Sequence, residues 1–154
     1  MAVGLENRVP PPVVALCAAG LMYAAAWLVP ALDFGLPWRR TIAAVLCVAG
    51  ASLDGVALAH FFRAKTTFNP LNPSAASALV TGGVYRFTRN PMYVGLALFL
   101  LAWGIYLANV AALALMPLFV FYINHFQIAP EERALRARFG AEFDAYCERV
   151  RRWL

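Results

Sequence analysis

The sequence predicts an all-α, polytopic membrane protein with about four transmembrane helices and a C-terminal amphipathic helix. Hydrophobic residues make up 62% of its 154 residues and charged residues only 14%. The mean hydropathy is +0.65, which is far too apolar for an ordinary soluble domain of this length. The apolar residues also gather into long runs, and about 20 helical residues cross the hydrocarbon core of a bilayer. The length allows one domain, residues 1–154.

The first two apolar runs predict an N-terminal helix pair within residues 1–62. Residues 13–32 form an apolar run of 20 residues, which is long enough to span a bilayer. A cleaved signal peptide is the alternative, but Glu6 and the length of the run argue against it. A turn at residues 33–40 leads into a second span, residues 41–62. We expect the two helices to form an antiparallel pair.

A long polar segment, residues 63–90, separates this pair from the next apolar run. Apolar residues do not recur at helical spacing in this segment. Any helix there would be broken by Pro70, Pro73, Gly82 and Gly83. Loops of this length are uncommon in compact domains and are usually functional or disordered. The tyrosines and threonines in this part of the chain favour a function.

A helical hairpin is predicted next. Residues 92–107 form a third apolar segment, Ala108 and Asn109 make a tight turn, and a fourth segment runs from residue 110 to about residue 128. Pro117 lies inside the fourth segment and is expected to kink it, because proline has no N–H to donate within a helix.

The last segment, residues 130–154, has six arginines and five acids. Apolar residues recur in it at helical spacing and predict one amphipathic helix that lies against the membrane or caps the bundle. These residues are Leu135, Phe139, Phe143, Tyr146 and Val150.

The basic residues predict the orientation in the membrane. With four spans, only Arg39 and Arg40 lie on one side. The positive-inside rule then places both termini and the long loop in the cytoplasm, in a prokaryotic cytoplasmic membrane. The net charge of +5 is explained by this orientation, so no nucleic-acid partner is expected. The basic residues on the other side are Arg8, Arg63, Lys65, Arg86, Arg89 and the six arginines of the tail.

Familiar catalytic signatures are absent from the sequence. It contains no phosphate-binding glycine loop, serine nucleophile elbow, HExxH or CxxC motif. Cys17 and Cys47 lie inside apolar runs, and the spacing of the three cysteines matches no metal site. We therefore expect reduced, structural cysteines and no bound metal.

Two polar clusters are candidates for a site. Asn90 and Pro91, preceded by Arg89 and followed by Tyr93, suggest a small-molecule site at the mouth of a helix. The alternative is a well-capped helix start, with Asn90 as the cap and Pro91 as the first helical residue.

Glu131 and Glu132, which follow Pro130, form the second cluster. Acids there complement a helix dipole, and this structural interpretation is favoured for the pair taken alone. Functionally, such a carboxylate could hold the ammonium or ribose of a ligand.

Three ionisable residues lie in or near the apolar runs. Asp54 falls near the middle of the second span, and an ionisable group inside a span is a functional candidate. It is equally compatible with helix packing. His60 and His125 lie near the cytoplasmic ends of the second and fourth spans, where they could meet, although lone histidines are more often packing residues.

The order of these features resembles a known family. The segment 79–95, LVTGGVYRFTRNPMYVG, is followed by the hairpin, by Glu131 and Glu132, and by FGAEFDAYCERVRRW at residues 139–153. Together they resemble the isoprenylcysteine carboxyl methyltransferase family, which is related to the membrane phospholipid N-methyltransferases. The family signature is Arg-His-Pro-x-Tyr, a hairpin and a Glu-Glu pair, and the resemblance covers roughly residues 60–153.

The resemblance implies S-adenosylmethionine as methyl donor, bound by the last helices, the loop and the tail rather than by a Rossmann domain. It implies that Glu131 closes the pocket and that Arg63 makes a polar contact with the cofactor. Arg89 and Glu132 are the catalytic candidates, expected to orient the pocket or the acceptor. The residues implied to line the cofactor pocket are Ser77, Ala78, Leu79, Val80, Tyr85, Asn90, Pro91, Met92 and Tyr93.

Two positions depart from the family pattern. Asn90 stands where the eukaryotic pattern has histidine, and Gln127 stands where the prenylcysteine enzymes place an arginine for the substrate carboxylate. Gln127 is therefore the candidate substrate-binding residue. These departures favour a prokaryotic relative that methylates another lipophilic or small acceptor, with a carboxylate, thiol or amine group.

The chemistry of methyl transfer agrees with this interpretation. The protein mainly has to position the reactants and exclude water. Tyr85 and Tyr93 could face a cationic sulfur through their rings, and Glu131 could meet a charged or hydroxyl group of the cofactor. The polar donor would enter from the cytosol and the apolar acceptor from the bilayer.

Two alternatives remain open at this point. A non-enzymatic transporter subunit or assembly protein centred on Asp54 predicts that Asp54→Asn abolishes function while substitutions in the loop are tolerated. A reductase with a nicotinamide cofactor is the other, because sterol reductases share a similar C-terminal architecture. With four spans, the chain is short for such a reductase.

Overall fold

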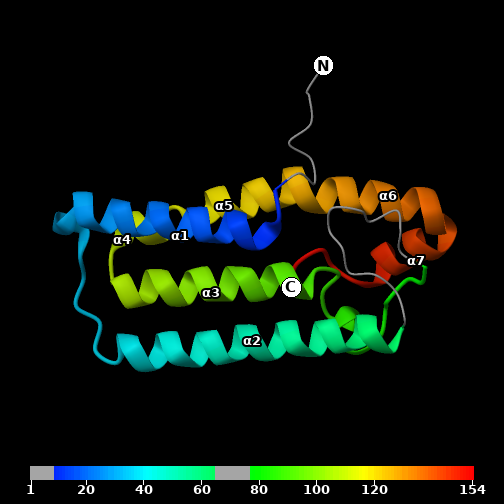
Figure 1. Ribbon diagram of the computed structural model, residues 1–154, viewed down its shortest axis with the longest axis horizontal. Helices are drawn as coiled ribbons and strands as arrows, with labels where there is room; N and C mark the ends of the chain where they lie inside the picture. Colours follow the sequence, from blue (N-terminus) through cyan, green and yellow to red (C-terminus); the bar gives the residue numbers. More distant parts are fainter. Residues whose placement is uncertain (1–8, 65–76) are drawn as a thin grey trace, which may run out of the picture.

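A computed structural model describes residues 9–64 and 77–154, and in these two ranges the chain is helical and forms no β-strand. The positions Arg8, Lys65, Pro70 and Pro73 fall outside them. Figure 1 shows the helices running side by side. In chain order they are α1 (Pro11–Leu28), η1 (Pro30–Leu32), α2 (Arg39–Arg63), η3 (Gly83–Arg86), α3 (Pro91–Leu107), α4 (Val110–Leu113), α5 (Met116–Ile123), the π-helical turn η4 (Asn124–Ile128), α6 (Ala129–Phe139) and α7 (Ala141–Arg149).

Three helical stretches in the described chain are long and apolar enough to cross a membrane. They are α1, α2 and the stretch Val110–Phe139, which combines α4, α5, η4 and α6. The fourth apolar helix, α3, has 17 residues and is shorter. The all-α membrane fold is therefore confirmed, although only three of the four predicted spans reach the full length.

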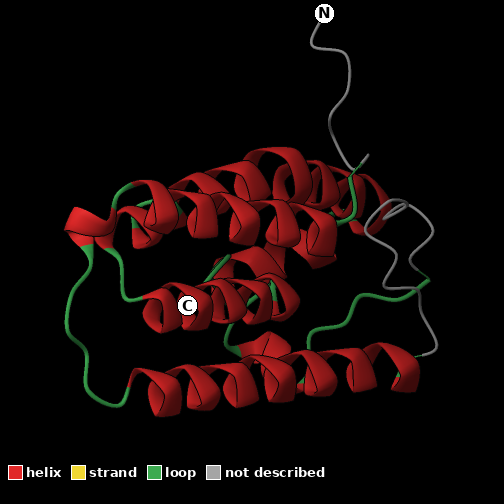
Figure 2. Ribbon diagram, turned by 60° about the vertical axis from the view of Figure 1, so that its left-hand side comes forward, coloured by secondary structure: helices red, strands yellow, loops and turns green. Residues whose placement is uncertain are grey.

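The order in which the helices pack differs from the prediction. We expected α1 and α2 to pair, but α3 lies between them (Figure 1 and Figure 2). A helix that is apolar all round is suited to the interior of a bundle, and α3 carries no charged residue. It therefore takes the central position and packs most extensively against α2.

A pair of glycines allows α2 and α3 to approach closely. A Cβ atom added to Gly50 would lie 3.1 Å from the carbonyl oxygen of Gly95, so that a larger side chain would push the helices apart. Gly50 thus makes a close helix contact. At Gly20 of α1, in contrast, no atom lies within 4 Å of such a Cβ.

The hairpin turn is fixed by Asn109, which is fully buried. Ala108 adopts a left-handed conformation, with φ of 53°, and ends α3 as predicted. The Asn109 side chain accepts a hydrogen bond from the Ala112 N–H, while its Nδ2 donates to Val29 O at 3.0 Å and to Asp33 Oδ1 at 2.7 Å. These bonds tie this turn to the connection between α1 and α2.

The boundary between the second arm of the hairpin and the tail differs from the one predicted. Helix α5 begins at Met116, so Pro117 sits in a first helical turn and interrupts the arm as expected. We expected a new helix to start at Pro130, but Ile128 and Ala129 already have helical dihedral angles. Because Pro130 has no N–H to donate, we attribute the π-helical turn just before it to this missing bond.

The tail contains two helices rather than one. Gly140, with φ of 51°, ends α6 and starts α7. The apolar stripe predicted from the sequence nevertheless forms a single cluster, because the two helices fold onto each other. Phe143, Tyr146 and Val150 are buried in it, and Leu135, Phe139 and Leu79 pack against them.

Candidate active site

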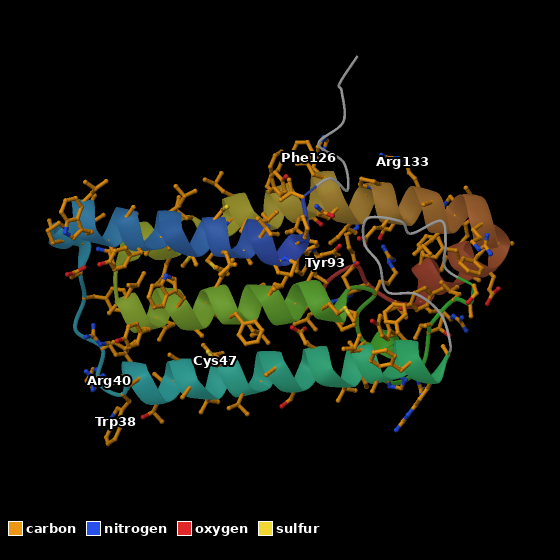
Figure 3. The ribbon with its side chains drawn as sticks, in the orientation of Figure 1. Trp38, Arg40, Cys47, Tyr93, Phe126 and Arg133 are labelled. Atoms are coloured by element: carbon orange, nitrogen blue, oxygen red, sulfur yellow. The ribbon has the colours of Figure 1, made fainter. Side chains whose placement is uncertain are left out.

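The candidate site forms where three distant parts of the chain meet. These parts are the segment that leads into α3, the first turn of α6 and the C-terminal end of the chain. Figure 3 shows Tyr93 in the space between the start of α3 and the helix that continues into α6. The site is thus assembled at one end of the bundle, at the opposite end from the Asn109 turn.

Tyr93 and Glu131 form its central contact. Tyr93 is the third residue of α3 and is only 7% exposed, and Glu131 is the third residue of α6. The Tyr93 hydroxyl donates a hydrogen bond to Glu131 Oε1 at 2.5 Å. The phenol is a neutral donor, so this bond does not pair Glu131 with a cation and leaves the carboxyl group able to bind one.

The side chain of Asn90 does not cap α3, contrary to the interpretation drawn from the sequence. Asn90 occupies the cap position and Pro91 the first helical position, but the cap makes no side-chain hydrogen bond to the helix. Instead, Asn90 Nδ2 donates to Arg152 O at 2.8 Å. The Thr88 hydroxyl donates to the same oxygen at 3.2 Å. The polar side chains before α3 therefore hold the C-terminal segment.

Arg89 lies at the centre of a cluster of charged groups. Its Nη2 donates to Glu132 Oε1 at 2.9 Å, and its Nη1 donates to Cys147 O at 3.0 Å and to Val150 O at 2.7 Å. Arg152 donates to Glu132 from the other side. The side chains of Arg89 and Glu132 are 13% and 12% exposed. The two candidates predicted to orient the pocket therefore bind each other and fix the end of α7.

Tyr85 is buried beside α2 at the same end of the bundle. Its ring meets those of His60 and Phe61 edge-on, and its carbonyl oxygen accepts a 2.7 Å hydrogen bond from the Tyr146 hydroxyl. Burial raises the pKa of both tyrosines, so each phenol is neutral at physiological pH. Gly83 has φ of 59°, and a Cβ there would overlap the His60 ring. Only glycine suits this close contact.

The remaining predicted site residues are more dispersed. Leu79 packs against the Phe143 cluster, and Gln127 is fully buried, with its Nε2 donating to Val9 O at 2.8 Å. Met92, Ala78 and Val80 are half-buried and Ser77 is exposed. Arg63 is exposed at the last residue of α2, on the opposite side of α3 from α6. The structure therefore does not bring Arg63 to the pair formed by Tyr93 and Glu131.

The two histidines also have separate surroundings. His60 contacts Tyr85, whereas His125 stacks on Phe121 and touches Phe126. The proposed meeting of these histidines is therefore wrong, because α2 and η4 lie on different sides of α3 (Figure 1).

Sequence reasoning missed the contribution of Thr88, Tyr146 and Arg152. All three act over long sequence separations, through backbone carbonyls or through Glu132. A surface pocket of about 320 Å³ opens beside the Tyr146 contact. Its lining residues are Thr81, Arg86, Tyr146, Arg149 and Val150.

Comparison with known proteins places this chain in a family. The family model of phospholipid methyltransferases matches residues 38–142, which include α2, α3 and the whole of α6. The chain belongs to this family. The matched range of the phospholipid methyltransferase model contains Arg89, Tyr93, Glu131 and Glu132. This membership does not favour the alternative of a non-enzymatic transporter subunit or assembly protein.

Two known proteins are similar to this chain. The chain is 48% identical over 63 residues to an uncharacterised protein of Haemophilus influenzae, an alignment that covers 41% of the chain and all of that protein. It is 26% identical over 113 residues to protein-S-isoprenylcysteine O-methyltransferase A of Arabidopsis thaliana. This second alignment covers 73% of the chain and 57% of the plant protein. The resemblance drawn from the sequence motifs is thus confirmed.

Proposed function

We propose that this protein is an integral membrane methyltransferase that uses S-adenosylmethionine to methylate a lipophilic or small acceptor. The observation that carries the proposal is the hydrogen bond from Tyr93 to Glu131. It joins the two motifs of the methyltransferase families into one site, inside the range that matches the phospholipid methyltransferase model. The acceptor group would be a carboxylate, a thiol or an amine.

The residues around this bond suit the proposed cofactor. Glu131 offers a carboxyl group in a mostly buried setting, where a cationic or hydroxyl partner is favourable. Buried Pro91 and Ile128 supply apolar surface nearby. When bound, S-adenosylmethionine supplies a methyl group on a cationic sulfur that an acceptor lone pair can take.

The chain's own residues would then position the reactants. Tyr93 holds the Glu131 carboxylate in place, and Arg89 and Glu132 fix the end of α7 beside the start of α3. We assign positioning roles to Arg89 and Glu132, because Arg89 Nη1 and Nη2 already bind the backbone and Glu132, and Arg152 binds Glu132 from the other side. Such preorganisation and the exclusion of water are the main demands of methyl transfer.

The other candidates have subsidiary roles in the proposal. Gln127 would meet the acceptor, since its Oε1 is buried and finds no hydrogen-bond donor within the described ranges. Arg63 lies on the other side of α3 and is left out of the proposed cofactor site. The proposed cofactor-lining residues are Ser77, Ala78, Leu79, Val80, Tyr85, Asn90, Met92 and the Tyr93 ring.

The proposed setting is a prokaryotic cytoplasmic membrane with both termini in the cytoplasm. Supporting this, the site lies at the end of the bundle that carries most of the arginines, while Arg39 and Arg40 lie at the start of α2. The cofactor would arrive from the cytosol, and a lipophilic acceptor would enter from the bilayer.

Calorimetric titration of the detergent-purified protein with S-adenosylmethionine tests the proposal. Saturable binding is expected for the wild type, with at least a tenfold weaker affinity in Glu131→Ala. Glu142→Ala is the matched control, because Glu142 is exposed in α7. Nicotinamide cofactors should not bind. A folded wild-type protein that does not bind S-adenosylmethionine would contradict the proposed function.

A further inference from the structure

A pocket beside α7 brings two arginines together at one end of the bundle. Its volume is about 320 Å³, at the lower end of the roughly 300–1,000 Å³ that is usual for ligand pockets. Arg86 lines it from the end of η3, and Arg149 lines it from the end of α7. Thr81, Tyr146 and Val150 complete the described lining. This lining therefore contains two cations and no acid.

Neither of these arginines is neutralised by a carboxylate in residues 9–64 and 77–154. The ion pairs there use Glu132 and Asp144, which bind other arginines. Arg149 Nε donates to Ala145 O at 3.2 Å, which leaves its two terminal nitrogens for a ligand. Two like charges around one pocket repel each other, and an anion placed between them replaces this repulsion by attraction. The pocket is therefore suited to an anion.

The donors that line the pocket are of the kind that binds phosphate. Guanidinium groups present pairs of N–H donors that match two phosphate oxygens at once. The Tyr146 hydroxyl already donates to Tyr85 O at 2.7 Å, so the arginines and the Thr81 hydroxyl are the donors that this lining offers to a ligand. A headgroup with a net negative charge suits them better than a zwitterionic one, whose cation they would repel.

The length of α2 places the pocket at the level of lipid headgroups. Helix α2 begins with an arginine pair, and about 20 helical residues cross the hydrocarbon core of a bilayer. Counted from Arg40, the core then ends near His60, in the last turn of α2. The rings of His60 and Phe61 meet the ring of Tyr85 edge-on, and Arg86 is the next residue. Arg86 thus lies where the phosphate groups of lipids are found.

Exposed apolar side chains at the same level indicate that this part of the protein faces lipid. Phe87, directly after Arg86, is 75% exposed, and Phe62 in the last turn of α2 is 65% exposed. Large apolar side chains next to arginines are typical of the boundary between headgroups and acyl chains. A lipid can therefore place its headgroup in the pocket while its acyl chains remain outside, in the bilayer.

We propose that Arg86 and Arg149 bind the phosphate group of an anionic phospholipid in this pocket. Basic pockets at the ends of membrane helices bind such headgroups by charge and hydrogen bonding. The bound lipid is not the methyl acceptor, and the inference does not depend on the proposed function. The headgroup stabilises the end of α7, because Val150 lines the pocket and its carbonyl oxygen accepts a hydrogen bond from Arg89.

Native mass spectrometry of the full-length protein in detergent, without S-adenosylmethionine, tests this inference. Dioleoyl phosphatidylglycerol and dioleoyl phosphatidylcholine are the probes, because they share the acyl chains and the phosphate group and differ in net charge. The wild type is expected to bind one phosphatidylglycerol at least tenfold more tightly than phosphatidylcholine. The same lipid should raise the midpoint of thermal unfolding, because it binds the folded state.

The double variant Arg86→Gln, Arg149→Gln should lose both effects. Its fold should be unchanged, since both side chains are exposed, and circular dichroism checks this. Arg149→Gln alone should weaken the preference at least threefold. The double variant Arg138→Gln, Arg151→Gln is the charge-matched control, because it removes two exposed arginines that do not line the pocket, and it should keep the preference.

Equal binding of the two lipids to the wild type would overturn the inference. An equal loss of preference in both double variants would also overturn it, because it would indicate attraction to the overall charge of the tail. Inorganic phosphate, added at the concentration of the lipid, should not displace phosphatidylglycerol, and displacement would assign the pocket to a free anion. A tenfold loss of affinity for S-adenosylmethionine in the Arg86, Arg149 double variant would assign the pocket to the cofactor instead.

Discussion

The Tyr93 hydroxyl donates a 2.5 Å hydrogen bond to the Glu131 carboxylate, joining the first turn of α3 to the first turn of α6. The two residues are separated by 38 positions in the sequence. Around them, Arg89, Glu132 and Arg152 form a second set of contacts that fixes the chain end. The following substitutions separate the contributions of these groups.

Tyr93→Phe keeps the ring and removes the hydroxyl that donates to Glu131. The carboxylate then loses its donor in a mostly buried site, so the free energy of unfolding should fall by about 1–3 kcal/mol. The affinity for S-adenosylmethionine should fall about tenfold, because Glu131 is no longer held in position. Thermal unfolding and calorimetry measure the two effects. Tyr106→Phe, near the other end of α3, is the control, and equal behaviour of the two variants would refute this role for Tyr93.

Glu132→Gln removes the charge that Arg89 and Arg152 share. Since the side chains of Arg89 and Glu132 are mostly buried, the substitution should reduce the stability by about 2–4 kcal/mol. Asp144→Asn breaks the pair with Arg136, whose two side chains are 51% and 52% exposed, and should have no measurable effect. Denaturant unfolding in detergent compares the variants. A stable Glu132→Gln protein would show that the cluster does not fix the chain end.

Asn90→Asp distinguishes a helix cap from a tertiary contact. Aspartate caps helices as well as asparagine does, so a capping residue would tolerate the change. The structure predicts a loss of about 1–3 kcal/mol in the free energy of unfolding, because aspartate cannot donate to Arg152 O and would place a negative charge against it. Urea-induced unfolding measures the difference. Wild-type stability in Asn90→Asp would favour the capping role.

Gly95→Ala should force α2 and α3 apart, because the new methyl group would overlap the Asp54 carboxylate. Overpacking of this kind typically costs about 1–3 kcal/mol. Asp54→Ala should relieve the overlap, so Gly95→Ala should cost little stability in that background. Thermal unfolding of the four proteins of this double-mutant cycle measures the coupling. Gly20→Ala, where a Cβ has open space, is the control. An equal cost of Gly95→Ala in both backgrounds would contradict the contact.

Much of the fold could be predicted because it depends on local properties of the chain. Hydropathy alone predicts the apolar runs and the turn at Ala108 that separates two of them. The interruption at Pro117 follows from the missing N–H of proline. The two site motifs were also recognisable, since each occupies a few consecutive residues. The sequence by itself therefore determined the class of protein, the apolar segments and the two motifs that contain Tyr93 and Glu131.

Only the tertiary structure decided how these parts meet. Lipid tails are as apolar as leucine, so a lipid-facing side of a helix has the same composition as a buried one, and periodicity could not reveal that α3 separates α1 from α2. The partners of Asn90 and Arg89 lie about 60 residues away in the chain, at Arg152 and Val150. Such contacts form because the folded helices bring the ends of distant segments together. No local sequence pattern indicates which distant segments will meet.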